Sequence, residues 1–357
     1  MKLYNRINRK ELKEKMLQSD EKRITLSFYK YYSLKNPRFF RDHFYLFLSQ
    51  YRVFGRIYVS HEGVNAQISV PEKYWDEFQE ALGEEILFLK NIRLNVAIED
   101  DGKSFFMLRI KVRDKIVADG LDDDTFDVTK RGRPLSAAEV NAKVDQEGAR
   151  FVDMRNYYEW EVGHFENAFL PDVENFRSAL PYVEKALEEE KDKPIIMYCT
   201  GGIRCEKASA YYLHKGFKEV YMVDGGIIEY ARQCEEKGLE NKFVGKNFVF
   251  DERLGESVSS DVIASCHQCG APCDSHTNCA NDACHILFIQ CEECAAHYEN
   301  CCSQKCADFN RLPEDERNKW KTKIEFKGSK SGKARYNPEG KDDPLVLPEE
   351  AQMNVPS

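Results

Sequence analysis

The chain has 357 residues and a formal net charge of −9, with 42% hydrophobic and 32% charged residues. At roughly 100 to 200 residues per domain this length allows two or three domains, and the composition excludes an intrinsically disordered chain. The negative charge excludes nucleic-acid binding through an overall cationic field, so any such binding requires local basic patches.

The hydropathy of the chain gives no sign of export or of membrane insertion. The first fifteen residues lack the apolar core of a signal peptide, and no stretch approaches the roughly 18 apolar residues of a membrane span. We therefore expect a cytoplasmic protein with no membrane partner. The thirteen cysteines are then expected to bind metal or to react, because the cytosol keeps thiols reduced.

The N-terminal part alternates strand and helix patterns. The first elements are a strand at 24–32 and a helix at 37–51, for which Asn36 is the N-cap. Two hairpin strands joined at His61-Glu62-Gly63 follow, and then a helix at 72–83 and strands near 92–98 and 105–117. This βαββαβ order predicts a ferredoxin-like α+β domain over residues 1–118.

The last of these strands places cations on one face. Arg109, Lys111, Arg113 and Lys115 occupy odd positions, while Leu108, Ile110, Val112 and Ile116 occupy even ones. A row of this size could contact several RNA phosphates, and a solvated sheet face is the alternative.

Residues 119–134 are predicted to be a linker. The five aspartates at 119, 122, 123, 124 and 127 lack the glycine and terminal Glu of a calcium loop, which favours a solvated connection over an ion site.

Residues 135–240 predict an α/β domain with a parallel sheet. Ser136 and Glu139 form a capping-box pattern, and buried strands at 151–154, 194–199 and 220–223 alternate with helices. Ligand sites in such sheets lie at the carboxyl ends of the strands, which is where Cys199 falls.

The loop after the second of these strands has the composition of an anion site. It reads Cys199, Thr200, Gly201, Gly202, Ile203 and Arg204. The glycines allow backbone N–H groups to point inward, and the helix N-terminus favours a thiolate at Cys199. The CxxxxR spacing is one residue shorter than the CxxxxxR of cysteine phosphatases, which favours a persulfide over a phosphocysteine. Cys205 could resolve an oxidised Cys199, but core packing is the preferred interpretation.

These residues resemble the rhodanese family. The resemblance rests on that loop, on Asp224-Gly225-Gly226, and on the signature positions Asp153, Arg155, Glu159 and His164. It implies that Cys199 carries a persulfide and that the four signature residues are mainly structural.

A cysteine-rich module is predicted over residues 241–310. Two CxxC pairs, Cys266 with Cys269 and Cys291 with Cys294, have the spacing of a structural four-thiolate zinc site. A second site is possible among further residues, of which four cannot be selected from spacing: Cys273, His276, Cys279, Cys284, Cys301, Cys302 and Cys306.

Residues 311–357 are predicted to be a basic, flexible tail. Lys319, Lys321 and Lys323 begin a run of cations that reaches Arg335, with aromatic residues between them. Such a segment suits RNA, and a solubilising tail is the alternative.

Over almost the whole length, the chain resembles the bacterial tRNA uridine 5-hydroxylases. The matching runs include 59–71, 100–120, 198–210, 245–256 and 266–279. The resemblance implies a tRNA partner and an oxygen-dependent hydroxylation of the wobble uridine that requires Cys199. We find no flavin or nicotinamide motif, and the oligomeric state is not indicated. The alternatives are a persulfide-carrying sulfurtransferase and a non-enzymatic, zinc-dependent binding scaffold.

Overall fold

The computed structural model describes residues 3, 7–121, 126–144, 148–321, 325–326 and 345–346. It divides into two compact units. The first contains residues 1–160 and 164–259, and the second contains residues 161–163 and 260–357. None of the helices within the described ranges has the length and apolar character that a bilayer span requires.

The first unit begins with helix α1 (Arg9–Gln18) and a five-stranded sheet in the order β4-β1-β3-β2-β5. The strands are β1 (Arg23–Tyr31), β2 (Phe54–Ser60), β3 (Gly63–Pro71), β4 (Asn95–Val96) and β5 (Leu108–Val112). The antiparallel order 4-1-3-2 confirms the predicted ferredoxin-like fold, and β5 adds a parallel strand beside β2.

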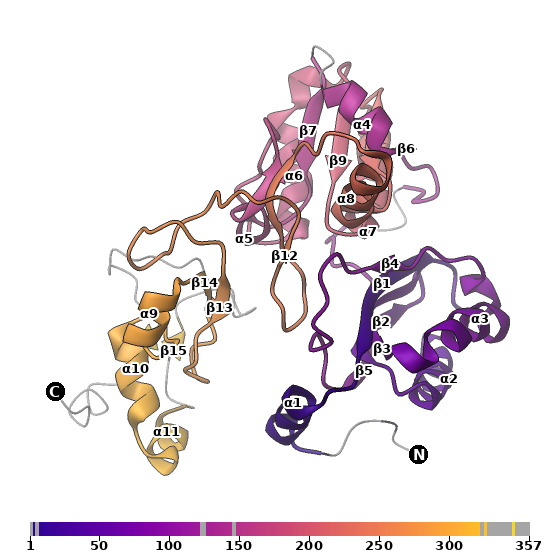
Figure 1. Cartoon of the computed structure of the whole chain (residues 1–357). Helices are drawn as coiled ribbons and strands as arrows, with labels where there is room; N and C mark the ends of the chain where they lie inside the picture. The colour runs from indigo at the N-terminus through magenta and orange to yellow at the C-terminus, as the bar shows by residue number, and fades with distance from the viewer. Residues whose placement is uncertain are drawn as a thin grey trace. The chain divides into compact units, whose positions relative to one another are not determined.

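Helices cover only one face of this sheet (Figure 1). They are α2 (Pro37–Gln50) and α3 (Trp75–Glu85), with short 3-10 turns η1 (Glu72–Tyr74) and η2 (Leu87–Leu89). Asn36 caps α2 by accepting a hydrogen bond from the backbone N–H of Phe39 at 3.1 Å. Alternate strand residues such as Leu26 and Phe28 pack in the core beneath the helices, so the residues between them line the opposite face.

The strand that was predicted to carry four cations is shorter than expected. β5 ends at Val112, which is 39% exposed rather than buried. Beyond it the N–H of Arg113 still donates to the carbonyl of Val59 at 2.9 Å, and the next contact is with a side chain, since Glu62 accepts from the N–H of Ile116 at 2.7 Å. Lys115 turns away to Asp119, at 2.7 Å. The row therefore does not include Lys115, and Asp119 is buried rather than solvated. The aspartates at 122–124 lie outside the described residues.

The rest of the unit is built on a parallel sheet in the order β6-β10-β9-β7, as predicted. Its strands are β6 (Arg133–Leu135), β7 (Arg150–Asp153), β9 (Ile195–Tyr198) and β10 (Val220–Val223). Helices α6 (Phe176–Ala186) and α7 (Ile203–His214) pack on one face, and α4 (Ala137–Val144) and α8 (Gly226–Lys237) pack on the other. The capping box is confirmed, because Glu139 accepts from the N–H of Ser136 at 3.0 Å.

Shorter elements complete this part of the chain. They are α5 (Tyr157–Trp160), β8 (Gly163–Phe165), η4 (Glu188–Glu190), β11 (Phe243–Asn247) and β12 (Glu256–Ser257). Residues 241–259 pack in the first unit, so the second compact unit begins later than the cysteine-rich module was predicted to begin.

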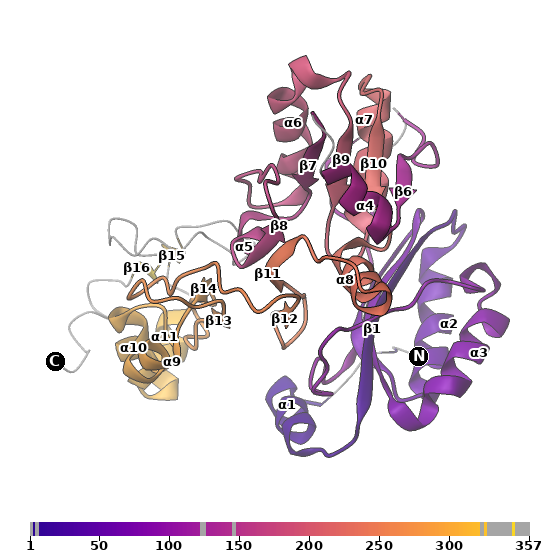
Figure 2. The same cartoon turned by 45° about the horizontal axis from the view of Figure 1, so that its top comes forward.

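The described part of the second unit contains the antiparallel pair β13 (His276–Asn278) and β14 (Leu287–Ile289), followed by helices (Figure 2). The helices are α9 (Glu292–His297), α10 (Gln304–Arg311) and α11 (Glu314–Lys321). Residues 314–321 were predicted to be part of a flexible tail but form α11, whose first turn is acidic. The chain then shows a two-residue pairing of β15 (Glu325–Phe326) with β16 (Leu345–Val346).

Candidate active site and metal centres

The loop from Cys199 to Gly202 connects β9 to α7 and wraps the thiol in backbone groups. The N–H of Gly202 donates to Sγ of Cys199 at 3.2 Å, and the carbonyl of Cys199 accepts from the N–H of Ile227 at 3.0 Å. Gly202 has φ +97°, a left-handed conformation in which glycine avoids the steric cost of a side chain. The turn thus places the thiol at the N-terminal end of α7.

The surroundings of Cys199 favour its thiolate. Burial alone would raise the pKa of this thiol. Hydrogen bonds from the Cys205 side chain and from the N–H groups of Arg204 and Cys205, together with the charge of Arg204, outweigh burial and lower the pKa to about 6. The pKa of Cys205 shifts the opposite way, because burial and Cys199 raise it, so of these two neighbouring thiols the site favours the thiolate form only at Cys199.

Of the four rhodanese-signature residues, Glu159 contacts the loop directly, while the other three make contacts behind it. Glu159 accepts from both terminal nitrogens of Arg204, at 2.6 and 2.8 Å, and Asp153 holds the fully buried Arg155 at 2.7 Å. Nδ1 of His164 lies 3.0 Å from the carbonyl of Phe165. None of Asp153, Arg155, Glu159 and His164 lines the cavity described next.

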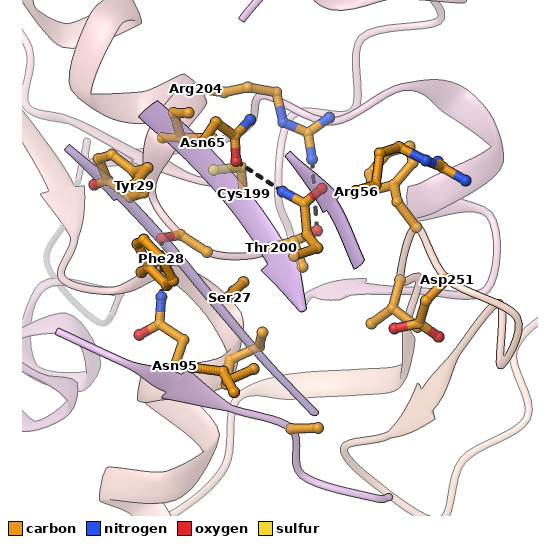
Figure 3. A pocket seen from close by; sticks show the side chains of 18 of the residues that line it. Ser27, Phe28, Tyr29, Arg56, Asn65, Asn95, Cys199, Thr200, Arg204 and Asp251 are labelled. Carbon is orange, nitrogen blue, oxygen red and sulfur yellow. Dashed lines mark hydrogen bonds between the residues drawn. The ribbon is translucent and has the colours of Figure 1, made fainter. Parts of the chain in front are cut away.

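Cys199 lies in a cavity of about 340 Å³, here called the Cys199 cavity, whose opposite wall comes from the N-terminal sheet (Figure 3). The loop contributes Cys199, Thr200, Gly201, Ile203 and Arg204; the sheet contributes Ser27, Tyr29, Arg56, Tyr58, Asn65, Gln67 and Asn95; residues 249–251 and 253 contribute a third side. A Cβ at Gly202 would lie 3.0 Å from the hydroxyl of Tyr29, so the glycine also permits this close approach.

The sheet register aligns the polar residues of this wall in two rows. One row runs Asn95, Ser27, Gln67, Arg56, Arg109, and the next runs Tyr29, Asn65, Tyr58, Lys111. Because paired residues share a face, each row leads from the cavity to the cations of β5.

A cation cluster is formed by four residues: Arg109 and Lys111 of β5, Arg113 just beyond its end, and Arg56 of β2. Within the described ranges, no carboxylate forms an ion pair with any of the four. Partial burial and repulsion from the three arginines lower the pKa of Lys111. A cluster of unneutralised cations is a surface suited to an anion.

The remaining basic candidates are Lys115 and three lysines nearer the C-terminus. Lys115 is engaged by Asp119. Lys319 lies on α11 in the second unit, as does Lys321, whose side chain is outside the described residues. Lys323 also lies outside them.

A buried lysine ties the two domains of the first unit together. Lys207, on α7, contacts Glu62 of the β2–β3 hairpin and Asp119, each at 2.6 Å. Arg93 also connects the two domains, because both of its terminal nitrogens donate hydrogen bonds to Asp224, at 2.7 and 2.5 Å. Neither pairing was predicted, since the partners are more than 80 residues apart in sequence.

The second unit brings eight thiols into two groups of four. Cys266, Cys269, Cys291 and Cys294 form the first group, as the spacing predicts, and Cys279, Cys284, Cys302 and Cys306 form a fully buried second group. Cys273, His276 and Cys301 belong to neither. Within each group all sulfurs lie within 4.8 Å of one another.

The sulfur separations suit tetrahedral metal rather than disulfides. The Sγ atoms lie 3.6 Å apart in Cys269 and Cys291, 3.7 Å apart in Cys284 and Cys302, and 3.6 Å apart in Cys302 and Cys306. A tetrahedron with Zn–S bonds of about 2.3 Å has edges of about 3.8 Å, whereas a disulfide is about 2.05 Å. The N–H groups of Cys291 and Cys302 also donate to Cys266 and Cys279, at 3.4 Å each. Both groups could hold a metal ion.

Comparison with family models agrees with this architecture. Residues 23–116 match the model of the UPF0176 acylphosphatase-like domain, residues 136–233 match the rhodanese-like domain, and residues 244–307 match the rhodanase C-terminal model. The fold and the cysteine loop thus define a rhodanese-domain protein with an additional N-terminal α+β domain.

Whole-chain relatives identify the family further. The chain is 59% identical over 314 residues to the tRNA uridine(34) hydroxylases of Pectobacterium atrosepticum and of Yersinia pestis, covering 88% of each chain. A solved rhodanese-like domain protein from Staphylococcus aureus is 22% identical, with a TM-score of 0.23, over 28% of this chain and 90% of that one. This chain belongs to the tRNA uridine(34) hydroxylase family.

Proposed function

We propose that this protein hydroxylates C5 of the wobble uridine of tRNA, with Cys199 as the reactive residue and molecular oxygen as co-substrate. The activity in the names of its relatives and their 59% identity support the RNA substrate. The single structural observation that carries the proposal is the Cys199 cavity, because it joins a thiolate to a cationic sheet face.

The size of the cavity fits a nucleoside. Small-molecule sites usually have volumes of about 300 to 1,000 Å³, and this cavity of about 340 Å³ lies at the lower end. Arg56 lies at the cavity and is paired in register with Arg109, so phosphates next to an inserted base would meet the cation cluster.

The involvement of oxygen rests on the family resemblance and is part of the proposal. Converting C5–H to C5–OH with O₂ places one oxygen atom on the base and the other in water, and it consumes two electrons and two protons. A reductant is therefore required as a further reactant.

Nucleoside analysis tests this function directly. The gene is expressed in a bacterial host that lacks its own homologue, and digested tRNA is analysed by mass spectrometry. The wild-type chain should restore 5-hydroxyuridine and the Cys199→Ala variant should not. Cys234→Ala is the matched control, since Cys234 is also buried but lies outside the cavity. Restoration by Cys199→Ala would contradict the proposed role.

The rival function is sulfur transfer by a Cys199 persulfide to a small thiol or RNA acceptor. The loop alone would serve this reaction, and a sulfurtransferase that acts on a small thiol needs no cationic sheet opposite its cysteine; with an RNA acceptor only the reaction product distinguishes the two functions. Thiosulfate-dependent sulfur transfer without restored 5-hydroxyuridine would favour this rival.

We also propose that both cysteine groups bind structural zinc. Four thiolates at tetrahedral separations are a set that selects zinc or iron–sulfur chemistry, and full burial of the second group suits a closed structural site. The two groups alternate along the chain. The pairs Cys266/Cys269 and Cys291/Cys294 form the first group, and the pairs Cys279/Cys284 and Cys302/Cys306 form the second.

A further inference from the structure

The wall of the Cys199 cavity contains a side-chain amide whose orientation is fixed by its neighbours. Nδ2 of Asn65, which is labelled in Figure 3, donates to the carbonyl of Ile116 at 3.1 Å. Nε2 of Gln67 donates to Oδ1 of Asn65 at 2.7 Å. A backbone carbonyl can only accept a hydrogen bond, so the Asn65 amide has one allowed orientation. Asn65 in turn fixes the amide of Gln67.

This chain of hydrogen bonds ends in an acceptor atom at the cavity. With Nε2 of Gln67 directed at Asn65, Oε1 of Gln67 is the atom left to bind a ligand. No residue within the described part of the chain donates a hydrogen bond to this oxygen. Asn65 and Gln67 are both partly exposed and both line the cavity together with Cys199.

We infer that Gln67 distinguishes uracil from cytosine by accepting a hydrogen bond from N3–H of the base. This inference rests on the proposed function and deepens it by naming a specificity-determining residue. Uracil carries a hydrogen on N3, whereas cytosine has a lone pair there that would face the lone pairs of Oε1. Binding at N3 leaves the C5–C6 edge of the ring uncovered for reaction.

The position of Gln67 in the sheet agrees with this assignment. Gln67 is paired in register with Arg56, and Arg56 with Arg109. The cation cluster therefore lies along the same row of the sheet as Gln67, where it can meet the phosphates next to a bound base. Single-stranded RNA bases are commonly read along this edge once they are unstacked.

The test uses anticodon stem-loop RNAs that differ only at position 34, which carries uridine, cytidine or 3-methyluridine. Binding to the full-length protein is measured by fluorescence anisotropy. The wild type should bind the uridine RNA best, because 3-methyluridine lacks N3–H. Gln67→Met keeps the side-chain length but removes the acceptor, so affinity for the uridine RNA should fall about tenfold and the preference over the other two RNAs should disappear.

A second variant separates orientation from binding. Asn65→Leu removes the group that orients Gln67, so the amide can rotate and offer Nε2 to N3 of cytosine. This variant should gain affinity for the cytidine RNA while affinity for the uridine RNA changes by less than about threefold. Gln50→Met, on the exposed end of α2, is the control for removal of a glutamine from this domain.

The outcomes separate the two proposals. If folded Gln67→Met and Asn65→Leu both keep the wild-type ratios of affinity among the three RNAs, the assignment of Gln67 is wrong while the proposed function stands. Thermal melting shows whether each variant is folded, and a variant that does not fold is replaced by Gln67→Leu or Asn65→Ala in the same assay. Failure of the wild type to form 5-hydroxyuridine in cells would instead overturn the proposed function.

Discussion

Glu159 accepts from both terminal nitrogens of Arg204, and both side chains are almost completely buried. The attraction of Arg204 keeps the pKa of Glu159 low although burial alone would raise it. Arg204 in turn is one of the groups that lower the pKa of Cys199. The pair therefore connects the stability of the loop to the charge of its thiol.

Breaking this pair should destabilise the protein. Glu159→Ala leaves the Arg204 charge buried without its partner, so we expect the free energy of unfolding to fall by about 3 to 5 kcal/mol. The double variant Glu159→Leu with Arg204→Met should cost less, because no charge is left unpaired. Chemical denaturation measures both. A single variant as stable as the wild type would show that the pair does not hold the loop.

The reactivity of Cys199 should depend on pH with a midpoint of about 6. Only the thiolate reacts, so alkylation by iodoacetamide should rise with pH through this value and level off above about pH 7. Mass spectrometry of peptides separates Cys199 from the other cysteines. Cys234, whose pKa is raised by burial, serves as an internal control that reacts only at alkaline pH.

The same shift has a consequence for stability. A folded-state pKa of about 6 lies below the value of about 8.5 for a free thiol, so the thiolate favours the folded state above that higher pH. This contribution is lost as the pH falls toward about 6. A Cys199 midpoint near the free-thiol value of about 8.5 would contradict both expectations.

The cation cluster should determine how tRNA binding responds to salt. Replacing Arg109, Lys111 and Arg113 by Ala should weaken binding to all tRNA sequences about equally, and it should flatten the salt slope by roughly one unit for each phosphate that is no longer neutralised. Replacing Lys35, Arg38 and Lys90 by Ala removes three exposed cations from the helical side of the same domain and is the matched control. Equal slopes for the two triple variants would show that the cluster is only solvated surface. Deletion of residues 318–357 tests the C-terminal cations in the same assay.

Reduced protein should contain two zinc ions per chain, one for each group of four cysteines, as measured by elemental analysis. Cys269→Ser and Cys306→Ser should each lower the zinc content and the thermal stability, because each opens one group of four. Cys273→Ser and Cys301→Ser should keep both ions, because these residues belong to neither group. Metal-free reduced wild type, or full zinc content in Cys306→Ser, would contradict this assignment.

The elements with local signals were predictable from the sequence. Asn36 before α2, the capping box at Ser136 and the glycines after Cys199 act through neighbouring residues, and the structure shows each of them. The first cysteine group was predictable for the same reason, since CxxC spacing is a local property.

The features that could not be predicted depend on contacts between distant parts of the chain. The second cysteine group could not be selected, because its pairs have the less regular separations of Cys279 to Cys284 and Cys302 to Cys306. The sheet wall of the Cys199 cavity was missed, since Gln67 and Cys199 meet only through the packing of two domains. Alternation alone identified Arg109 and Lys111, but not the turn that directs Lys115 to Asp119.

If both cysteine groups bind metal as proposed, the alternation of ligand pairs in the second unit orders their filling during synthesis. The first group is complete once residue 294 has left the ribosome, and the second only after residue 306. Cys279 and Cys284 lie inside the loop that closes when the first group binds its ion. Closure of the first group would therefore confine Cys279 and Cys284 before Cys302 and Cys306 exist, and a chain truncated between residues 294 and 302 would keep a complete first group but only half of the second.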